Sequence, residues 1–188
     1  MHGVISLLDS THYEQVERLW AELEARFGVR GVYITPYPHV SYHVAAAYDR
    51  ARLEPIVRAL AGEIAPFRVR TAGLGVFTGA QPVLYLPVVR TVPLSHLHAR
   101  LWEVLAPAAG DSNTYYHPDR WLPHVTIGFG DVPPERLAPI IAHLAARSFD
   151  WEITLDHLAL IYDHGDGQIV QTRYPFGHPA RANEEEPR

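Results

Sequence analysis

Two similar segments, YPHVSYHV at residues 37–44 and LPHVTIGF at residues 122–129, decide the expected fold. Each places Pro-His, an apolar residue and a hydroxyl residue inside a run of strand-forming side chains. Around each segment the hydrophobic pattern predicts the same order of elements: a strand and a helix before it, then a helix and a strand after it. The sequence therefore predicts an internal duplication, in which two α+β units meet across a pseudo-twofold axis.

The first helix has recognisable start and stop signals. Thr11 and Glu14 have the spacing of a capping box, and Gly28 is placed to end the helix. The other elements are expected in chain order as a strand at 4–8, the strand at 37–44, a helix around 53–60, a strand from 67, a strand at 83–89, a helix over 93–105, a loop at 110–120, the strand at 122–129, a helix from 133 to 144, a strand from 149, and strand-like runs at 153–162 and 169–174 that form a hairpin.

We expect one bilobal α+β domain over residues 1–178. Each lobe should be an antiparallel sheet with helices on its outside, with the lobes at approximately 1–80 and 81–178 and an exchange of strands between them left open. Residues 179–188 contain three consecutive glutamates, so a disordered acidic tail is expected there.

Composition excludes several classes of chemistry. The chain has no cysteine, which removes thiol nucleophiles and thiolate metal ligands, and no lysine, which removes Schiff-base chemistry and the common P-loop. The net charge of −5 argues against broad capture of duplex nucleic acid. The segment MHGVISLLDS at residues 1–10 lacks a basic region and a long apolar run, so we expect no signal peptide, no membrane association and a cytoplasmic location.

The repeated motif carries the candidate chemistry. On a strand, His39 and Ser41 share one face, and so do His124 and Thr126. If the two halves face each other across a cleft, two imidazoles flank two hydroxyl groups. In-line attack at phosphorus needs a base and an acid on opposite sides and donors for the nonbridging oxygens, so this set fits a phosphodiester.

At these residues the sequence resembles the 2H phosphoesterase superfamily, specifically the 2'-5' RNA ligase and cyclic phosphodiesterase-like proteins. That family is recognised by two His-apolar-[Ser/Thr]-apolar motifs; HVSY at 39–42 matches it loosely and HVTI at 124–127 fully. The resemblance implies metal-independent hydrolysis of 2',3'-cyclic phosphates or 2'-5' linked RNA or nucleotide ends, with reverse RNA ligation as a further activity. It also implies that His39 and His124 are acid and base, and that Ser41 and Thr126 bind the phosphate.

The same resemblance implies no cofactor and no metal, RNA ends or a small cyclic nucleotide as the binding partner, and no obligate protein partner. The second motif continues into Ile127-Gly-Phe129 instead of the basic residue often found in the ligase-like branch. Phosphate contacts beyond the scissile group are therefore not expected from this segment.

Several further residues are weaker candidates. Tyr116 and Trp121, near the second motif, are candidate substrate contacts that could stack on a base. His43 is expected on the same strand face as His39 in a structural role, and His98 on a solvated helix surface. Two alternatives stay open: a noncatalytic RNA- or nucleotide-binding module on the same fold, and a His-based metallohydrolase, although no HExxH motif is present.

Overall fold

The structure, a computed structural model, describes residues 1–163, 165 and 167–177. The expected acidic tail at 179–188 lies outside this range. The elements in chain order are β1 (His2–Leu7), α1 (Ser10–Phe27), η1 (Gly31–Ile34), β2 (His39–Tyr48), α2 (Arg50–Glu63), β3 (Phe67–Arg70), β4 (Gly75–Phe77), β5 (Val83–Pro87), α3 (Val92–Leu105), η2 (Ala106–Ala108), β6 (Ala109–Ser112), η3 (Thr114–Tyr116), β7 (His124–Gly128), α4 (Pro134–Leu144), β8 (Glu152–Leu155), β9 (His157–Asp163) and β10 (Gln168–Pro175).

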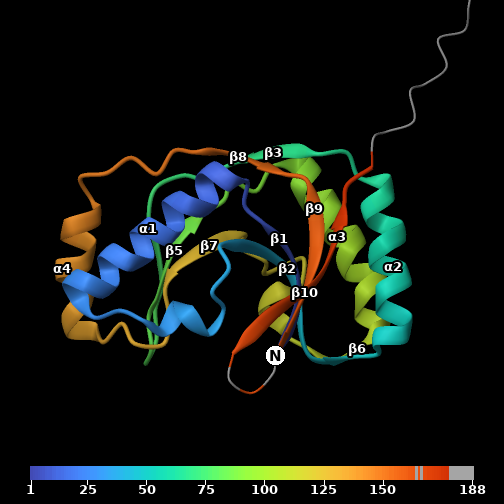
Figure 1. The fold of residues 1–188 in the computed structure, drawn as a ribbon, viewed down its shortest axis with the longest axis horizontal. Helices are drawn as coiled ribbons and strands as arrows, with labels where there is room; N and C mark the ends of the chain where they lie inside the picture. The colour runs from blue at the N-terminus through green and yellow to red at the C-terminus, as the bar shows by residue number, and fades with distance from the viewer. Residues whose placement is uncertain (164, 166, 178–188) are drawn as a thin grey trace, which may run out of the picture.

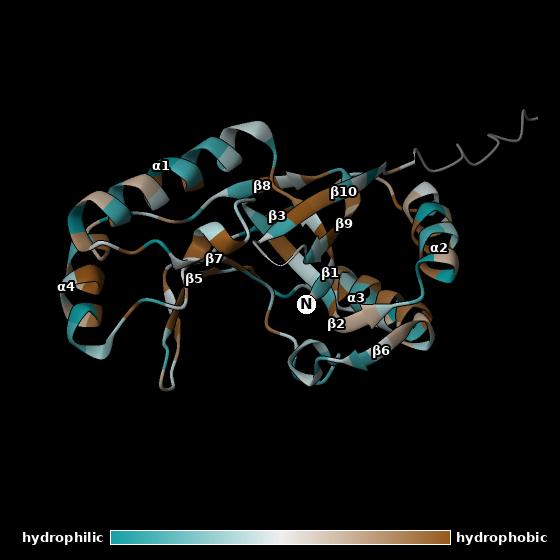
Figure 2. Cartoon of the chain, turned by 60° about the horizontal axis from the view of Figure 1, so that its bottom comes forward, coloured by the Kyte–Doolittle hydropathy of each residue, from teal (hydrophilic) through white to brown (hydrophobic). Residues whose placement is uncertain are grey.

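The predicted α+β architecture with antiparallel sheets is confirmed. In the described part of the chain, the strands form a five-stranded sheet of order β10-β9-β1-β2-β6, a three-stranded sheet of order β4-β5-β7, and the pair β3-β8. Helices α1 and α4 lie at one end of the molecule, and α2 and α3 lie at the other (Figure 1). The helices carry alternating hydrophilic and hydrophobic residues (Figure 2), as expected for helices with one face on a core.

Both lobes draw on both halves of the chain. The larger sheet combines β1 and β2 with β9 and β10, and α2 packs on β10 while α3 packs on β2. In the other lobe, α1 from the start of the chain packs on β7 and α4. A division at residue 80 therefore does not separate the two lobes, because their strands and helices are interleaved.

The first helix begins two residues earlier than its capping signal predicts. Asp9 is the N-cap, and its carboxylate accepts the backbone N–H of His12 at 3.1 Å, so Thr11 and Glu14 lie inside the helix and the predicted capping box is wrong. The predicted end is confirmed, because Gly28 adopts a left-handed φ of 68° after the last turn.

Two further segments differ from their predicted form. The expected loop at 110–120 contains most of β6, which pairs with β2, and the expected single run at 153–162 breaks at Asp156 into β8 and β9 of different sheets. The hairpin of β9 and β10 is confirmed. No helix in the described ranges is both long and apolar enough to cross a bilayer.

A β-bulge in β2 matters for the site. Val4 on β1 pairs with His43, whereas the next residue, Ile5, pairs with Ser41, so Tyr42 is an extra residue in β2. The alternation of faces shifts at this point: Val44 lines the same pocket as Ser41, while His43 is buried away from it. The expectation that His43 shares the face of His39 is therefore wrong.

Candidate functional site

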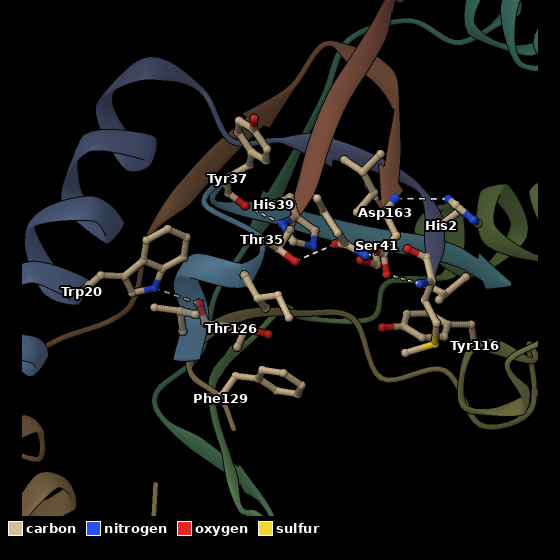
Figure 3. Close-up of a pocket in the computed structure, with 16 residues that line it drawn as sticks. His2, Trp20, Thr35, Tyr37, His39, Ser41, Tyr116, Thr126, Phe129 and Asp163 are labelled. Carbon is tan, nitrogen blue, oxygen red and sulfur yellow. Dashed lines mark hydrogen bonds and ion pairs between the residues drawn. The ribbon is translucent and has the colours of Figure 1, made fainter. Parts of the chain in front are cut away.

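A pocket of about 270 Å³ lies between the two lobes (Figure 3). Residues from both lobes line it: Met1, His2, Trp20, Val32, Ile34, Thr35, Tyr37, His39, Ser41, Val44, Tyr116, Thr126, Phe129, Ile161, Asp163 and Gln168. Four of the six residues singled out in the sequence are therefore in its wall, namely His39, Ser41, Tyr116 and Thr126.

The two motif strands come together at this pocket. Strands β2 and β7 contact each other. A positive charge on His124 would lower the pKa of His39, so the two imidazoles are close enough to interact electrostatically. His124 does not line the pocket itself. It lies two residues before Thr126 on β7, and its ring packs edge-on against Phe77 and Tyr85, with centroids 5.0 and 5.3 Å away.

The two imidazoles are held in the same way. Nδ1 of His39 donates to the carbonyl oxygen of Tyr37 at 2.5 Å, and Nδ1 of His124 donates to that of Leu122 at 2.7 Å. A carbonyl oxygen can only accept, so each contact fixes the proton on Nδ1 and leaves Nε2 as the free basic nitrogen of the neutral ring. Each motif therefore presents one Nε2 in a defined tautomer.

Both imidazoles are neutral near pH 7. Loss of water around the ring is the main cause that lowers the pKa of His39 to about 4, and the bond to Tyr37 opposes this effect only in part. Loss of water also lowers the pKa of His124. In the free protein, each ring is thus ready to accept a proton, and an anion bound beside either ring would raise its pKa.

Two tryptophan indoles support the hydroxyl residues of the two motifs. Nε1 of Trp20 donates to the backbone oxygen of Thr126 at 3.1 Å (Figure 3), and Nε1 of Trp121 donates to that of Ser41 at 2.9 Å. β7 is an edge strand, and β6 pairs with β2 only from Ala45 onward. Each indole therefore donates a hydrogen bond to a backbone oxygen that has no partner strand beside it. We expect these bonds to fix the orientation of both hydroxyl residues.

Trp121 does not occupy the position expected of a substrate contact. Its side chain is only 2% exposed, and its ring stacks on that of His98 with the centroids 3.7 Å apart. Tyr116 instead lines the pocket, and its hydroxyl is within hydrogen-bonding reach of Ser41. Nothing in the local sequence distinguishes these two aromatic residues, because their burial is decided by packing against β2.

Two buried histidines lie behind β2. The prediction of a solvated His98 is wrong: it is fully buried on α3, and its Nε2 donates to the backbone oxygen of Tyr42 at 2.9 Å. His43 is also fully buried, which supports its expected structural role. Its Nδ1 is hydrogen-bonded to the hydroxyl of Tyr48 at 2.5 Å. Desolvation lowers the pKa of both rings to about 4.

The far wall of the pocket has a polar chain that the sequence did not predict. Thr35 donates to the side-chain oxygen of Gln168 at 2.5 Å, Gln168 donates to the backbone oxygen of Met1 at 2.6 Å, and the amino group of Met1 forms an ion pair with Asp163 at 2.8 Å. Among the residues that the structure describes, no three His, Asp or Glu side chains are grouped as metal ligands.

Known proteins resemble this chain in sequence profile and in fold. The profile of the 2'-5' RNA ligase superfamily matches residues 9–167, whereas comparison with curated proteins gave no match. TT0787 of Thermus thermophilus has a similar structure, with a TM-score of 0.62 and 18% identity over 93% of this chain and 97% of that one. LigT of E. coli, solved with ATP, has a TM-score of 0.54 and 13% identity over 95% of this chain and 100% of that one. These TM-scores show a shared fold, and the profile match shows the family: the chain belongs to the 2'-5' RNA ligase superfamily, a group of phosphoesterases and ligases.

Proposed function

We propose that this protein is a metal-independent phosphodiesterase that opens 2',3'-cyclic phosphates or cleaves 2'-5' linked RNA or nucleotide ends, with ligation as the reverse reaction. The observation that carries the proposal is the matched pair of imidazoles on β2 and β7. His39 and His124 have the same tautomer, each beside a hydroxyl residue on the same strand. This is the arrangement that acid–base catalysis at a single phosphorus atom requires.

In the proposed hydrolysis, one imidazole takes a proton from water at Nε2 as the water oxygen attacks phosphorus. The bond from phosphorus to one ribose oxygen breaks, and the protonated second imidazole gives its proton to that leaving oxygen. The hydroxyl groups of Ser41 and Thr126 donate to the nonbridging oxygens, where negative charge grows. Because the two motifs are nearly equivalent, either histidine can serve as the base, and the reverse reaction exchanges the two roles.

The lowered pKa values of His39 and His124 give this proposal a pH signature. One ring must be protonated at the start of the reaction, which in the free protein requires a pH below the ordinary histidine pKa of about 6.5. We expect a bell-shaped profile of kcat/KM with its maximum below about pH 6.5. The profile of kcat should lie at higher pH, because the bound phosphate anion raises the pKa of the acid. Coincident maxima above neutrality would contradict this assignment.

The direct test is incubation of the purified protein with a 2',3'-cyclic nucleotide in EDTA, followed by identification of the product. We expect a nucleoside monophosphate, and the isomer formed tells which ester bond breaks. Turnover that disappears in EDTA and returns with zinc or manganese would favour the metallohydrolase alternative. Binding without turnover would favour the noncatalytic module.

A further inference from the structure

The described wall of the pocket offers no arginine or lysine side chain to a second phosphate. None of the described residues that line it is an arginine, and the chain contains no lysine. The positive charge that does reach the lining, the amino group of Met1, is already paired with Asp163. The phosphate groups of the proposed reaction are therefore served by imidazoles and hydroxyls alone.

Arginines on the segments that lead into the pocket have other partners. Arg30, just before η1, pairs with Glu24 at 3.1 Å. Arg90 donates to the backbone oxygens of Trp121 and Pro118 at 3.0 and 2.6 Å, and so holds the loop behind the pocket. Both guanidinium groups therefore have partners that do not line the pocket.

Opposite the polar chain of Thr35, Gln168 and Asp163, another part of the wall is apolar. Trp20 and Val32 contribute to this part, and Ile34 and Phe129, which line the pocket but are 55% and 43% exposed, form its rim. An anion brought against such a surface loses hydration without gaining a charged partner. Because the pocket is only about 270 Å³, we expect the next phosphate of a bound strand to meet this rim.

On the basis of the proposed function, we propose that the substrate is a small ester with one phosphate and a neutral remainder, such as a nucleoside 2',3'-cyclic monophosphate, and not the end of a polynucleotide. One negative charge can be accommodated between the imidazoles and the hydroxyls of Ser41 and Thr126. Each further phosphate of a strand adds desolvation at the rim and repulsion from a chain with a net charge of −5.

The test compares 2',3'-cyclic AMP with a short RNA oligonucleotide that ends in the same cyclic phosphate, at salt concentrations between about 50 and 200 mM. We expect kcat/KM for the mononucleotide to exceed that for the oligonucleotide by about 10-fold or more, with no fall in either value as salt rises, because no arginine contact releases counterions. Preference for the oligonucleotide with a steep salt dependence would overturn this inference alone. Turnover of neither substrate would overturn the proposed function and this inference with it.

A gain-of-function variant makes the test sharper. Ile34→Arg adds a cation at the rim, in a position that is already exposed. Phe129→Arg adds one at the rim residue that directly follows β7. Either variant should raise kcat/KM on the oligonucleotide relative to the mononucleotide and give a log–log salt slope of about −0.7 for one single-strand phosphate contact. Val92→Arg is the matched control, because Val92 is 68% exposed and lies outside the pocket. An unchanged substrate ratio in both rim variants would contradict the proposed role of the rim.

Discussion

His98 should make the stability of the fold sensitive to acid. The ring is fully buried between α3 and β2, stacked on Trp121, and desolvation lowers its pKa to about 4. In the unfolded chain the pKa of a histidine is about 6.5. Between these two values the unfolded state binds more protons than the folded state, so the free energy of unfolding falls as pH falls from about 6.5 and stops falling below about 4.

The expected magnitude follows from the two pKa values of His98. At pH 5 its ring is mostly neutral in the folded protein and almost fully protonated in the unfolded chain. Integrating the linkage relation from pH 7 to pH 5 gives a loss of about 2 kcal/mol from this one group. His39 and His43, with pKa values lowered to a similar level by desolvation, add to the loss in the wild-type protein.

Urea unfolding at pH 7 and pH 5 measures this effect. His98→Gln keeps a neutral donor for the backbone oxygen of Tyr42 but removes the titrating ring, so its difference in unfolding free energy between the two pH values should be smaller than that of wild type by about 2 kcal/mol. The lost stacking on Trp121 changes the unfolding free energy at both pH values, so it cancels from the difference between them. His96→Gln, two residues away on the exposed side of α3, is the control and should keep the full difference. A full difference in His98→Gln would refute the reasoning.

Three further predictions concern the pocket. His39→Ala and His124→Ala should each reduce kcat/KM on a cyclic phosphate by about 10²- to 10⁴-fold with unchanged circular dichroism, and near-wild-type turnover by either variant would exclude the acid–base pair. Thr126→Val should lose less activity than either histidine variant, because Ser41 still donates to the phosphate; an equal loss would mean that the two hydroxyls are not equivalent. Trp20→Phe removes the indole N–H from the backbone oxygen of Thr126 and should lower the unfolding free energy by about 1–3 kcal/mol, and an unchanged urea midpoint would show that this bond does not matter.

Local sequence rules determined the parts of this protein that depend on short segments. The period-two alternation placed Ser41 in the same row as His39, and both line the pocket. It also placed Thr126 in the same row as His124, with buried Val125 between them on β7. The position of Gly28 gave the end of the first helix, since few other residues adopt a positive φ without strain. These features depend on backbone geometry over a few residues, which the sequence specifies directly.

Long-range packing decided the rest. The bulge at Tyr42, which turns His43 away from the pocket, exists only in the pairing of β2 with β1. The indole of Trp121, 80 residues from Ser41 in the chain, became a backbone donor because β6 leaves that edge of β2 unpaired. An open strand edge requires a donor wherever the fold can supply one, and no local pattern records which distant side chain will reach it.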